Sequence, residues 1–146
     1  MNEGSYTEGV FSWPVRVYYE DTDFAGVVYY ANYLKFMERS RTEYLRFLGV
    51  EQDTLRTESN CIFVVRQALV DFHQAARFND ALNVQTSVKL KKKASILFHQ
   101  RIEKAEKKGG SLLICSADVT IACVDAGTFR PMRIPRFLLE MFERDS

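Results

Sequence analysis

The chain has 146 residues, of which 47% are hydrophobic and 27% charged, and its formal net charge is +1. This length suits one domain with its own core, and the composition excludes a disordered or membrane-embedded class. A net charge near zero provides no basic field for nucleic acid or a lipid surface, so we expect neither partner. We find no secretion signal and no apolar run long enough to span a bilayer, and expect no membrane insertion.

The three cysteines, Cys61, Cys115 and Cys123, stand in apolar runs and form no C-x-x-C pair. We expect buried, reduced thiols rather than metal ligands, because both histidines are distant from them in sequence. Reduced thiols and the absence of a signal predict a cytoplasmic location. The sequence predicts no cofactor.

The first predicted strand is WPVRVYY (13–19), a β-branched and aromatic run with a proline at its start. We expect the segment before it, 1–10, to be flexible. A helical period follows over 29–48, and Gly49 supplies the stop. Ser40 and Arg41 interrupt the apolar stripe of that helix. The residues on the stripe are Tyr30, Tyr33, Leu34, Met37, Tyr44, Leu45 and Leu48.

From Cys61 onward the hydrophobic period is two, which predicts strands. The first run is almost continuously apolar, which is typical of a strand covered on both faces. A tight turn is predicted at KKGG (107–110). A short helix is predicted over 135–144, with a proline at its first turn. The four predicted strands span 61–72, 82–90, 96–102 and 112–124.

The predicted order is a strand, a long helix and four strands in meander-like succession. This order predicts an α+β fold, in which one long helix is laid over a five-stranded antiparallel sheet. We expect a single domain over 1–146, without repeats or linkers. One helix cannot cover both sheet faces, and five strands leave two free edges, so a symmetric dimer is expected.

An acidic turn precedes the long helix: EDTDFAGVVYY (20–30) has three acids in its first four positions. The free N–H groups of a helix N-terminus favour negative charge and can hold an oxyanion. Gly26 permits backbone angles and a close approach that a side chain would block. An ionised acid and an oxyanion-binding helix end would together suit attack on an acyl carbonyl.

Spacing alone favours a simpler interpretation, because an Asp or Thr before a helix is usually a cap that contributes about 0.5–2 kcal/mol. A phosphotransfer site like that of the haloacid dehalogenase superfamily would need a parallel strand in a much larger α/β chain. A Mg²⁺ site on Asp21 and Asp23 would need a third acidic ligand, and none recurs at a suggestive position. We therefore expect no metal site.

The segment FSWPVRVYYEDTDFAGVVYYANYLKFMERSRTEYLR (11–46) resembles the hotdog-fold acyl-CoA thioesterases. The resemblance is strongest to the YbgC type, associated with the bacterial Tol-Pal gene cluster, and weaker to 4-hydroxybenzoyl-CoA thioesterase. It continues, less strongly, through 63–72, 97–102 and 123–135. It implies a hotdog fold, in which a strongly curved antiparallel sheet wraps the long helix. It also implies dimers joined edge to edge, which pair into tetramers in many members.

The resemblance also implies site residues. Asp23 would be the catalytic carboxylate, as nucleophile or general base, and the backbone N–H of Tyr30 would polarise the thioester carbonyl. Gly26 would shape the turn. The active site is expected at the dimer interface, where strand residues near 61–66 of the opposing subunit line the acyl pocket. The predicted substrate-binding residues are Val28, Tyr29, Tyr33, Phe63 and Val64.

The chain departs from the family pattern at a few positions. Relatives of the YbgC type commonly carry histidine where Tyr30 stands, which leaves only the main-chain role. Ala75 replaces a proline that is usual in the loop before Arg77. Phe24 and Ala25 replace smaller residues and are expected to narrow the pocket.

The densest basic run, KLKKKAS (89–95), lies in a predicted turn between strands, where relatives place residues that contact CoA. CoA carries several phosphate charges, for which basic side chains are expected. A solvated hairpin whose lysines discourage edge pairing remains an equal alternative. The candidate CoA-binding residues are Lys91, Lys92, Lys93 and Ser95.

The leading functional hypothesis is hydrolysis of an acyl-CoA thioester to a carboxylic acid and free CoA. A second hypothesis is a non-catalytic scaffold that binds acyl-CoA or acyl carrier protein in lipid or envelope metabolism. A third is a hotdog dehydratase or hydratase, which would usually show a catalytic histidine where Tyr30 stands.

Overall fold

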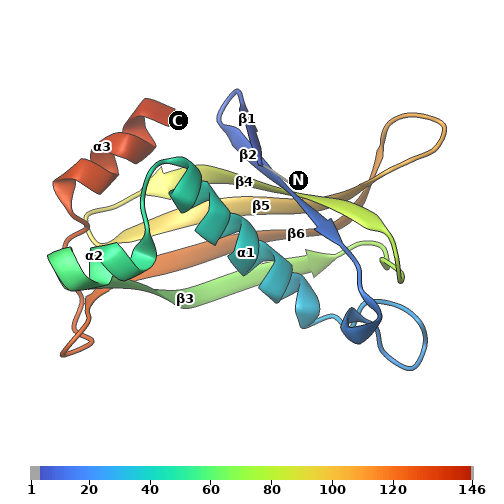
Figure 1. Cartoon of the computed structure of the whole chain (residues 1–146), viewed down its shortest axis with the longest axis horizontal. Helices are drawn as coiled ribbons and strands as arrows, with labels where there is room; N and C mark the ends of the chain where they lie inside the picture. The colour runs from blue at the N-terminus through green and yellow to red at the C-terminus, as the bar shows by residue number, and fades with distance from the viewer. Residues whose placement is uncertain (1–3, 146) are drawn as a thin grey trace.

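The computed structural model describes residues 4–145. A six-stranded antiparallel sheet, in the order β1-β2-β4-β5-β6-β3, carries the long helix α1 across one face (Figure 1). The strands are β1 (Ser5–Thr7), β2 (Val10–Arg16), β3 (Cys61–Phe72), β4 (Ala81–Lys91), β5 (Ser95–Ala105) and β6 (Ser111–Asp125). The helices are the 3₁₀ turn η1 (Tyr19–Asp21), α1 (Asn32–Phe47), α2 (Gln52–Ser59) and α3 (Arg136–Asp145).

The predicted α+β class and the long helix over an antiparallel sheet are confirmed, but the number of strands is not. The sheet has six strands rather than five, because β1 pairs with β2. The turn between them places Glu8 and Gly9 at positive φ, 49° and 82°. The expected flexible segment over 1–10 therefore contains a strand, and residues 1–3 lie outside the described part of the chain.

Strand β2, predicted over 13–19, ends earlier than predicted, at Arg16. Beyond Arg16, the N–H of Val17 donates to the carbonyl of Asp80 and the N–H of Tyr18 donates to the carboxylate of Asp21. The first bond continues the β2–β4 pairing by one residue, and the second turns the chain out of the sheet and into η1. Local side-chain capping has therefore replaced strand pairing at the aromatic pair that the composition assigned to a strand.

The meander-like order is confirmed only for β4, β5 and β6. Strand β3 joins the far side of β6, so the chain crosses the sheet between β3 and β4. β3 is thus an edge strand rather than one covered on both faces. Its central residues, 65–69, are exposed, with Val65 at 53% and Leu69 at 61%. An apolar edge of this length is a surface that another chain can cover.

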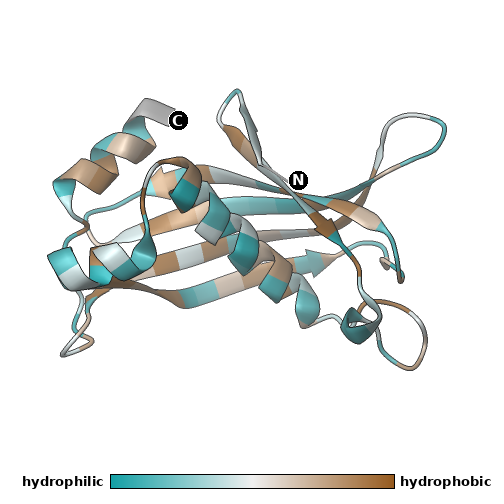
Figure 2. Cartoon of the chain, in the orientation of Figure 1, coloured by the Kyte–Doolittle hydropathy of each residue, from teal (hydrophilic) through white to brown (hydrophobic). Residues whose placement is uncertain are grey.

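The core lies between α1 and the sheet, and Figure 2 shows alternating hydrophobic bands on the strands beneath the helix. The helix buries apolar side chains at i, i+3, i+4 and i+7 spacing. Leu34, predicted on this stripe, is exposed, and Phe36 is buried in its stead. The apolar side chains of α1 buried in the core are Tyr33, Phe36, Met37, Tyr44 and Leu45.

Polar residues on the buried face of α1 have partners on the sheet. The hydroxyl of Ser40 lies 2.7 Å from that of Thr86, and Arg41 donates to the side-chain oxygen of Gln100 at 2.9 Å. The amide nitrogen of Gln100 donates to the carbonyl of Met37 and to the Thr86 hydroxyl. A satisfied network of this kind allows polar groups to interrupt the stripe without an unpaired buried donor.

Helix α2 was not predicted, since it is short and buries only Leu55. It ends at Asn60, whose positive φ of 52° is a helix stop that Asn can supply. Helix α3 begins directly after Pro135, as predicted. All three cysteines are free and buried. Among the described residues, no helix combines the length and apolar character needed to cross a bilayer.

Candidate active site

The acidic segment folds into a narrow hairpin over residues 22–28. Thr22 and Val28 form a bridge, and the N–H of Asp23 donates to the carbonyl of Val27 at 2.8 Å. The N–H of Gly26 returns to the carbonyl of Asp23 at 3.0 Å. Gly26 has a φ of 83°, which residues with a side chain rarely adopt, so its role in shaping the turn has a direct steric basis.

Two residues of the acidic segment have structural roles. The Asp21 carboxylate accepts the N–H of Tyr18 at 2.8 Å. The carbonyl of Asp21 accepts the N–H of Tyr29 and the side-chain amide of Asn32, both at 2.9 Å. The hydroxyl of Thr22 donates to the carbonyl of Tyr19 at 2.7 Å. These contacts stabilise η1 rather than the long helix, because α1 begins at an Ala31 N-cap without a side-chain cap bond, so the capping interpretation is wrong for α1; they leave Asp23 unaccounted for.

The Asp23 side chain is exposed, and one of its two carboxylate oxygens accepts a hydrogen bond. Its Oδ1 accepts the N–H of Ala25 at 2.9 Å, which orients the carboxylate. Within residues 4–145, its second oxygen has no hydrogen-bond partner. A carboxylate that is held by one oxygen and free at the other is available to a ligand.

The entry to α1 presents a free amide. A tight turn precedes the helix, in which the N–H groups of Asn32 and Tyr33 donate to the carbonyls of Tyr29 and Tyr30. In the described part of the chain, no acceptor bonds to the N–H of Tyr30 itself. Such a group at a helix start can stabilise negative charge on a carbonyl oxygen.

The loop between β3 and β4 packs against the hairpin and is hydrogen-bonded to it. Ala76 is buried; its carbonyl accepts the N–H of Val28 at 2.8 Å and its N–H donates to the hydroxyl of Tyr33 at 3.0 Å. Burial raises the pKa of Tyr33. Arg77 also forms a bridge with Val27. The loop is thus bonded to the hairpin at both Val27 and Val28, with Ala75 directly before these contacts.

Exposed aromatic side chains surround this hairpin. Phe24 is fully exposed at its tip, and the rings of Tyr29 and Tyr30 lie 5.0 Å apart, centre to centre, at an interplanar angle of 52°. Tyr30 packs edge-on against Phe72, at the end of β3, at 5.8 Å. Large aromatic surface left open beside a free carboxylate is typical of a site that a ligand or a second chain completes.

The residues predicted to bind substrate are divided by the structure. Tyr29 is exposed at the helix entry, whereas Val28 and Tyr33 are buried in the core. Phe63 points to the helix side of the sheet, where it lines a cavity. Val64, the next residue along β3, lies on the opposite face, because side chains alternate along a strand.

Two cavities flank α1, and Asp23 lines neither of them. The first is about 170 Å³ and lies between the C-terminal half of α1 and the sheet. The second is an open groove of about 540 Å³ between α1 and the β3 edge, with Arg41 in both linings. Arg41 stands eleven residues after Tyr30, about 16 Å along a helix, so the first cavity is remote from the Asp23 hairpin of the same chain.

The predicted CoA-binding residues are also remote from Asp23. They occupy the β4–β5 turn, at the end of the sheet where α2 and α3 lie, whereas the hairpin lies at the opposite end (Figure 1). Lys92 and Lys93 are exposed, Lys91 is half-buried and Ser95 is buried. The candidate residues therefore form two groups in one chain, one at each end of α1.

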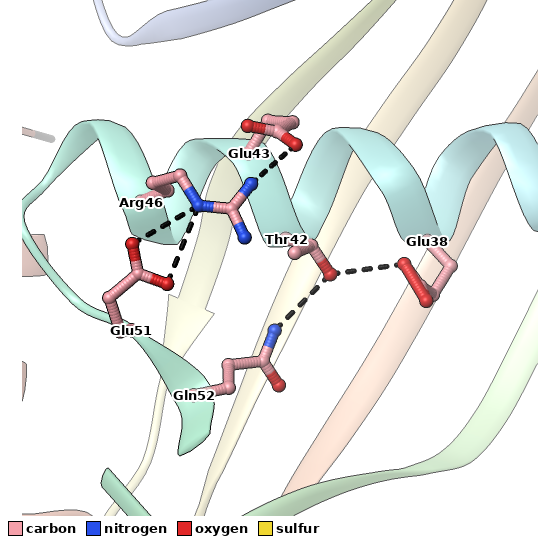
Figure 3. Close-up of polar contacts among 6 residues, drawn as sticks. All are labelled: Glu38, Thr42, Glu43, Arg46, Glu51 and Gln52. Atoms are coloured by element: carbon pink, nitrogen blue, oxygen red, sulfur yellow. Dashed lines mark hydrogen bonds and ion pairs between the residues drawn. The ribbon is translucent and has the colours of Figure 1, made fainter. Parts of the chain in front are cut away.

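Sequence reasoning missed the residues that rim the first cavity. The hydroxyl of Thr42 donates to Glu38 at 3.0 Å and accepts the side-chain amide of Gln52 at 3.2 Å (Figure 3). Beside them, Arg46 pairs with Glu43 and Glu51, which joins α2 to α1. Arg41 completes the rim, and burial lowers the pKa of its guanidinium. The signal available in the sequence was the interruption of the apolar stripe at Ser40 and Arg41.

The described residues contain no cluster of three or more His, Cys, Asp or Glu side chains that could hold a metal ion. Asp118, on the opposite sheet face, instead pairs with Lys89 and His99, each at 2.8 Å. The hydrogen bond from Lys89, followed by that from His99, lowers the pKa of this carboxyl. This cluster is a surface ion-pair network away from the hairpin.

Comparison with known proteins adds an independent finding. Residues 17–142 match the family model described as "Thioesterase-like superfamily". The chain is 48% identical over 126 residues to the acyl-CoA thioesterase YbgC of Haemophilus influenzae, covering 86% of this chain and 89% of that one. It is 42% identical over 135 residues to the acyl-CoA thioester hydrolase YbgC of an Escherichia coli O6:H1 strain, covering 92% and 97%.

A solved structure confirms the fold. The 4-hydroxybenzoyl-CoA thioesterase from Pseudomonas sp. strain CBS-3 superposes with a TM-score of 0.83 at 20% identity. The match covers 90% of this chain and 98% of that chain.

Proposed function

The chain belongs to the thioesterase-like superfamily and, within it, to the YbgC group of hotdog-fold acyl-CoA thioesterases, and from this premise we propose which residues hydrolyse the thioester. Asp23 supplies the reacting carboxylate, and the N–H of Tyr30 binds the carbonyl oxygen. The observation that carries the proposal is a carboxylate oriented by Ala25 with one free oxygen, a few residues before an unpaired helix-entry amide.

The chemistry follows from these two groups. As negative charge develops on the carbonyl oxygen, the N–H of Tyr30 stabilises it, and the CoA thiolate leaves. The carboxylate of Asp23 either attacks the carbonyl carbon, forming an anhydride that water then cleaves, or removes a proton from an attacking water. Both routes need the same free carboxylate oxygen, and both release a carboxylic acid and CoA.

A second copy of the chain is part of the proposal, because the Asp23 hairpin adjoins neither cavity of its own subunit. The exposed run of β3 is centred on Gln67. If two copies pair antiparallel about that residue, each β3 edge is covered by the same strand of the partner subunit. Apolar edges are then covered on both subunits.

This pairing would complete the site. Tyr30 packs on Phe72, at the end of β3 that would lie opposite Phe63 of the other copy. Phe63 and Val65 line the cavity of about 170 Å³. The hairpin of one subunit would therefore lie beside the cavity of the other. The lysines at the β4–β5 turn occupy the cavity end of that second subunit, so one composite site would gather both groups of predicted residues (Figure 1).

Further parts of the proposal concern context. The sheet face away from α1 carries the exposed Leu90, which a second dimer would cover in a dimer of dimers. The phosphate of a carrier protein's prosthetic arm would suit the same lysines as CoA does, so acyl carrier protein is a second potential thioester donor. Three free thiols support a cytoplasmic location, and the resemblance of residues 11–46 to the YbgC type implies an association with the Tol-Pal system.

The test is the Asp23→Asn variant, which keeps an oxygen that can accept the Ala25 N–H but removes the charge. We expect kcat to fall at least about 100-fold for every acyl-CoA tested, because a positioned acid or base contributes roughly 10²–10⁴-fold. The Kd of a non-hydrolysable acyl-CoA analogue should remain unchanged. Free thiol release, followed with short aliphatic, long aliphatic and aromatic acyl groups, provides the measurement.

The matched control is Glu20→Gln, which removes an exposed neighbouring charge and should leave kcat unchanged. Retained turnover in Asp23→Asn would reject the catalytic role. Binding of acyl-CoA by the wild-type protein without thiol release would instead favour the non-catalytic scaffold.

A further inference from the structure

The partly open cavity of about 170 Å³ beside α1 is bounded on one side by the C-terminal helix. Phe142 of α3 is 0% exposed and lines the cavity together with side chains of β3, β5 and β6. We infer that Phe142 sets the length of acyl group that the enzyme accepts. The inference rests on the proposed function, in that it takes this cavity as the acyl site.

The cavity has a polar rim and an apolar inner end. The rim residues are exposed or half-buried: Glu38, Arg41, Thr42 and Gln52. Phe63 and Val65, also on the open side, belong to the β3 edge where the partner subunit would dock. The inner lining is buried and apolar: Leu45, Ile96, Phe98, Ile121 and Phe142.

This polarity orients a bound thioester. The chain of hydrogen bonds from Gln52 through Thr42 to Glu38 holds the rim in place (Figure 3). An acyl tail gains free energy by entering the apolar end, whereas the polar thioester would lose its hydrogen bonds there. The carbonyl therefore remains at the rim, next to the position proposed for Asp23 of the partner subunit.

Phe142 is held firmly in the cavity wall. Its ring lies 6.1 Å from that of Tyr44 on α1 and 6.1 Å from that of Phe98 on β5. Leu138, one turn earlier on α3, is also fully buried and fixes the helix on the sheet. A longer acyl tail cannot displace this ring without breaking aromatic contacts on two other elements.

The cavity volume indicates the resulting limit. An apolar protein cavity of about 150 Å³ holds a benzene molecule. At about 170 Å³, this cavity holds one aromatic ring or an aliphatic tail of about six carbons. Longer tails would have to leave their terminal carbons outside.

The experiment measures binding against chain length and does not depend on turnover. Calorimetric titration with S-(2-oxoalkyl)-CoA ketones, which retain the carbonyl but cannot be hydrolysed, is applied to the wild-type protein and to Phe142→Ala. In the wild-type protein, affinity should rise about fourfold per methylene up to about six carbons and then level off. In Phe142→Ala, the rise should continue for at least about two more carbons.

Two further variants make the result interpretable. Phe142→Leu removes fewer atoms, so the chain length at which affinity levels off (the break) should increase by less than in Phe142→Ala. This variant provides the test if Phe142→Ala does not fold. Phe137→Ala is the matched control, since Phe137 is 46% exposed on the same helix and does not line the cavity. The profile of this control should match the wild-type profile.

Failure of the inference is distinct from failure of the proposed function. A break at the same chain length in the wild-type protein and both Phe142 variants would overturn the role of Phe142, whatever the hydrolysis assays give. A control variant that moved the break as far as Phe142→Ala would also overturn it. Loss of thiol release without a change in these binding profiles would reject the proposed chemistry and retain Phe142 as the length limit.

Discussion

The hydroxyl of Tyr33 accepts the buried N–H of Ala76 at 3.0 Å, and the carbonyl of Ala76 accepts the N–H of Val28 at 2.8 Å. One residue of the supporting loop is therefore bonded to the first turn of α1 and to the hairpin that carries Asp23. The position of the free carboxylate depends on a hydrogen bond made within the core.

We expect Tyr33→Phe to destabilise the protein by about 1–3 kcal/mol, because it leaves the Ala76 N–H buried and unpaired while keeping the ring. Urea unfolding measures this loss, and kcat should fall with it as the hairpin loosens. Tyr29→Phe, at an exposed tyrosine of the same turn, is the control. Equal stability of the two variants would show that the Tyr33 hydroxyl does not support the hairpin.

The β3 edge provides a prediction about assembly. Leu69→Lys places a charge at the exposed centre of this strand and should convert dimers into folded, inactive monomers, as measured by sedimentation and circular dichroism. Phe137→Lys introduces the same charge at an exposed apolar position on α3 and should leave the dimer intact. An active Leu69→Lys monomer would contradict a composite site.

The composite site also predicts complementation between two inactive variants. Asp23→Asn removes the catalytic group of one subunit, and Phe63→Glu would block the cavity of the other. After unfolding and refolding together, mixed dimers should carry one intact site, and activity should return to about a quarter of that of the wild-type protein. Recovery of no activity from folded mixed dimers would place both residues in the same subunit's site.

The exposed lysines of the β4–β5 turn should act on binding rather than on turnover. For the double variant Lys92→Ala, Lys93→Ala, we expect KM for acyl-CoA to rise roughly two- to thirtyfold, since each exposed charge pair contributes about 0.2–1 kcal/mol. Acyl-pantetheine, which lacks the nucleotide phosphates, should show no such change. Lys107→Ala, Lys108→Ala, in the β5–β6 turn, is the matched control; an equal KM in both pairs would favour the solvated-hairpin alternative.

Cys115 provides a prediction on pH. Burial raises the pKa of its thiol to about 12, so the folded chain keeps a proton that the unfolded chain releases above its ordinary pKa of 9.0. The stability that comes from this thiol is therefore complete below pH 9 and is lost as pH rises toward 12, by about 1.4 kcal/mol per pH unit. Against urea, Cys115→Ala should start less stable and lose stability less steeply between pH 9 and 11. Parallel pH profiles would contradict the assignment.

The parts of the fold that are predictable from the sequence are those with a strong local pattern. The alternation over β4 and the run of β3 locate both strands, and Pro135 locates the start of α3, because each signal arises from neighbouring residues. Helix α2 was missed because it has only eight residues and buries a single side chain, that of Leu55. The end of β2 was missed because the Asp21 carboxylate competes with strand pairing for the N–H of Tyr18.

One part of the candidate site could likewise be predicted from the sequence, and another part could not. The acidic hairpin could be identified from its motif, and its free carboxylate and amide lie close together in sequence. The cavity could not, since its lining combines α1, three strands, the first residue of α2 and one side chain of α3. Only the folded chain brings Gln52 and Phe142 to the same space.

The incomplete edge of the sheet has a consequence for the stability of the protein itself. If a second subunit covers β3 (Cys61–Phe72), it binds the native chain and not the unfolded one. The melting temperature should therefore rise with protein concentration by mass action. Newly synthesised or highly diluted subunits would expose the apolar β3 edge until they associate with a second subunit. Loss of activity on dilution would then precede any change in catalytic chemistry.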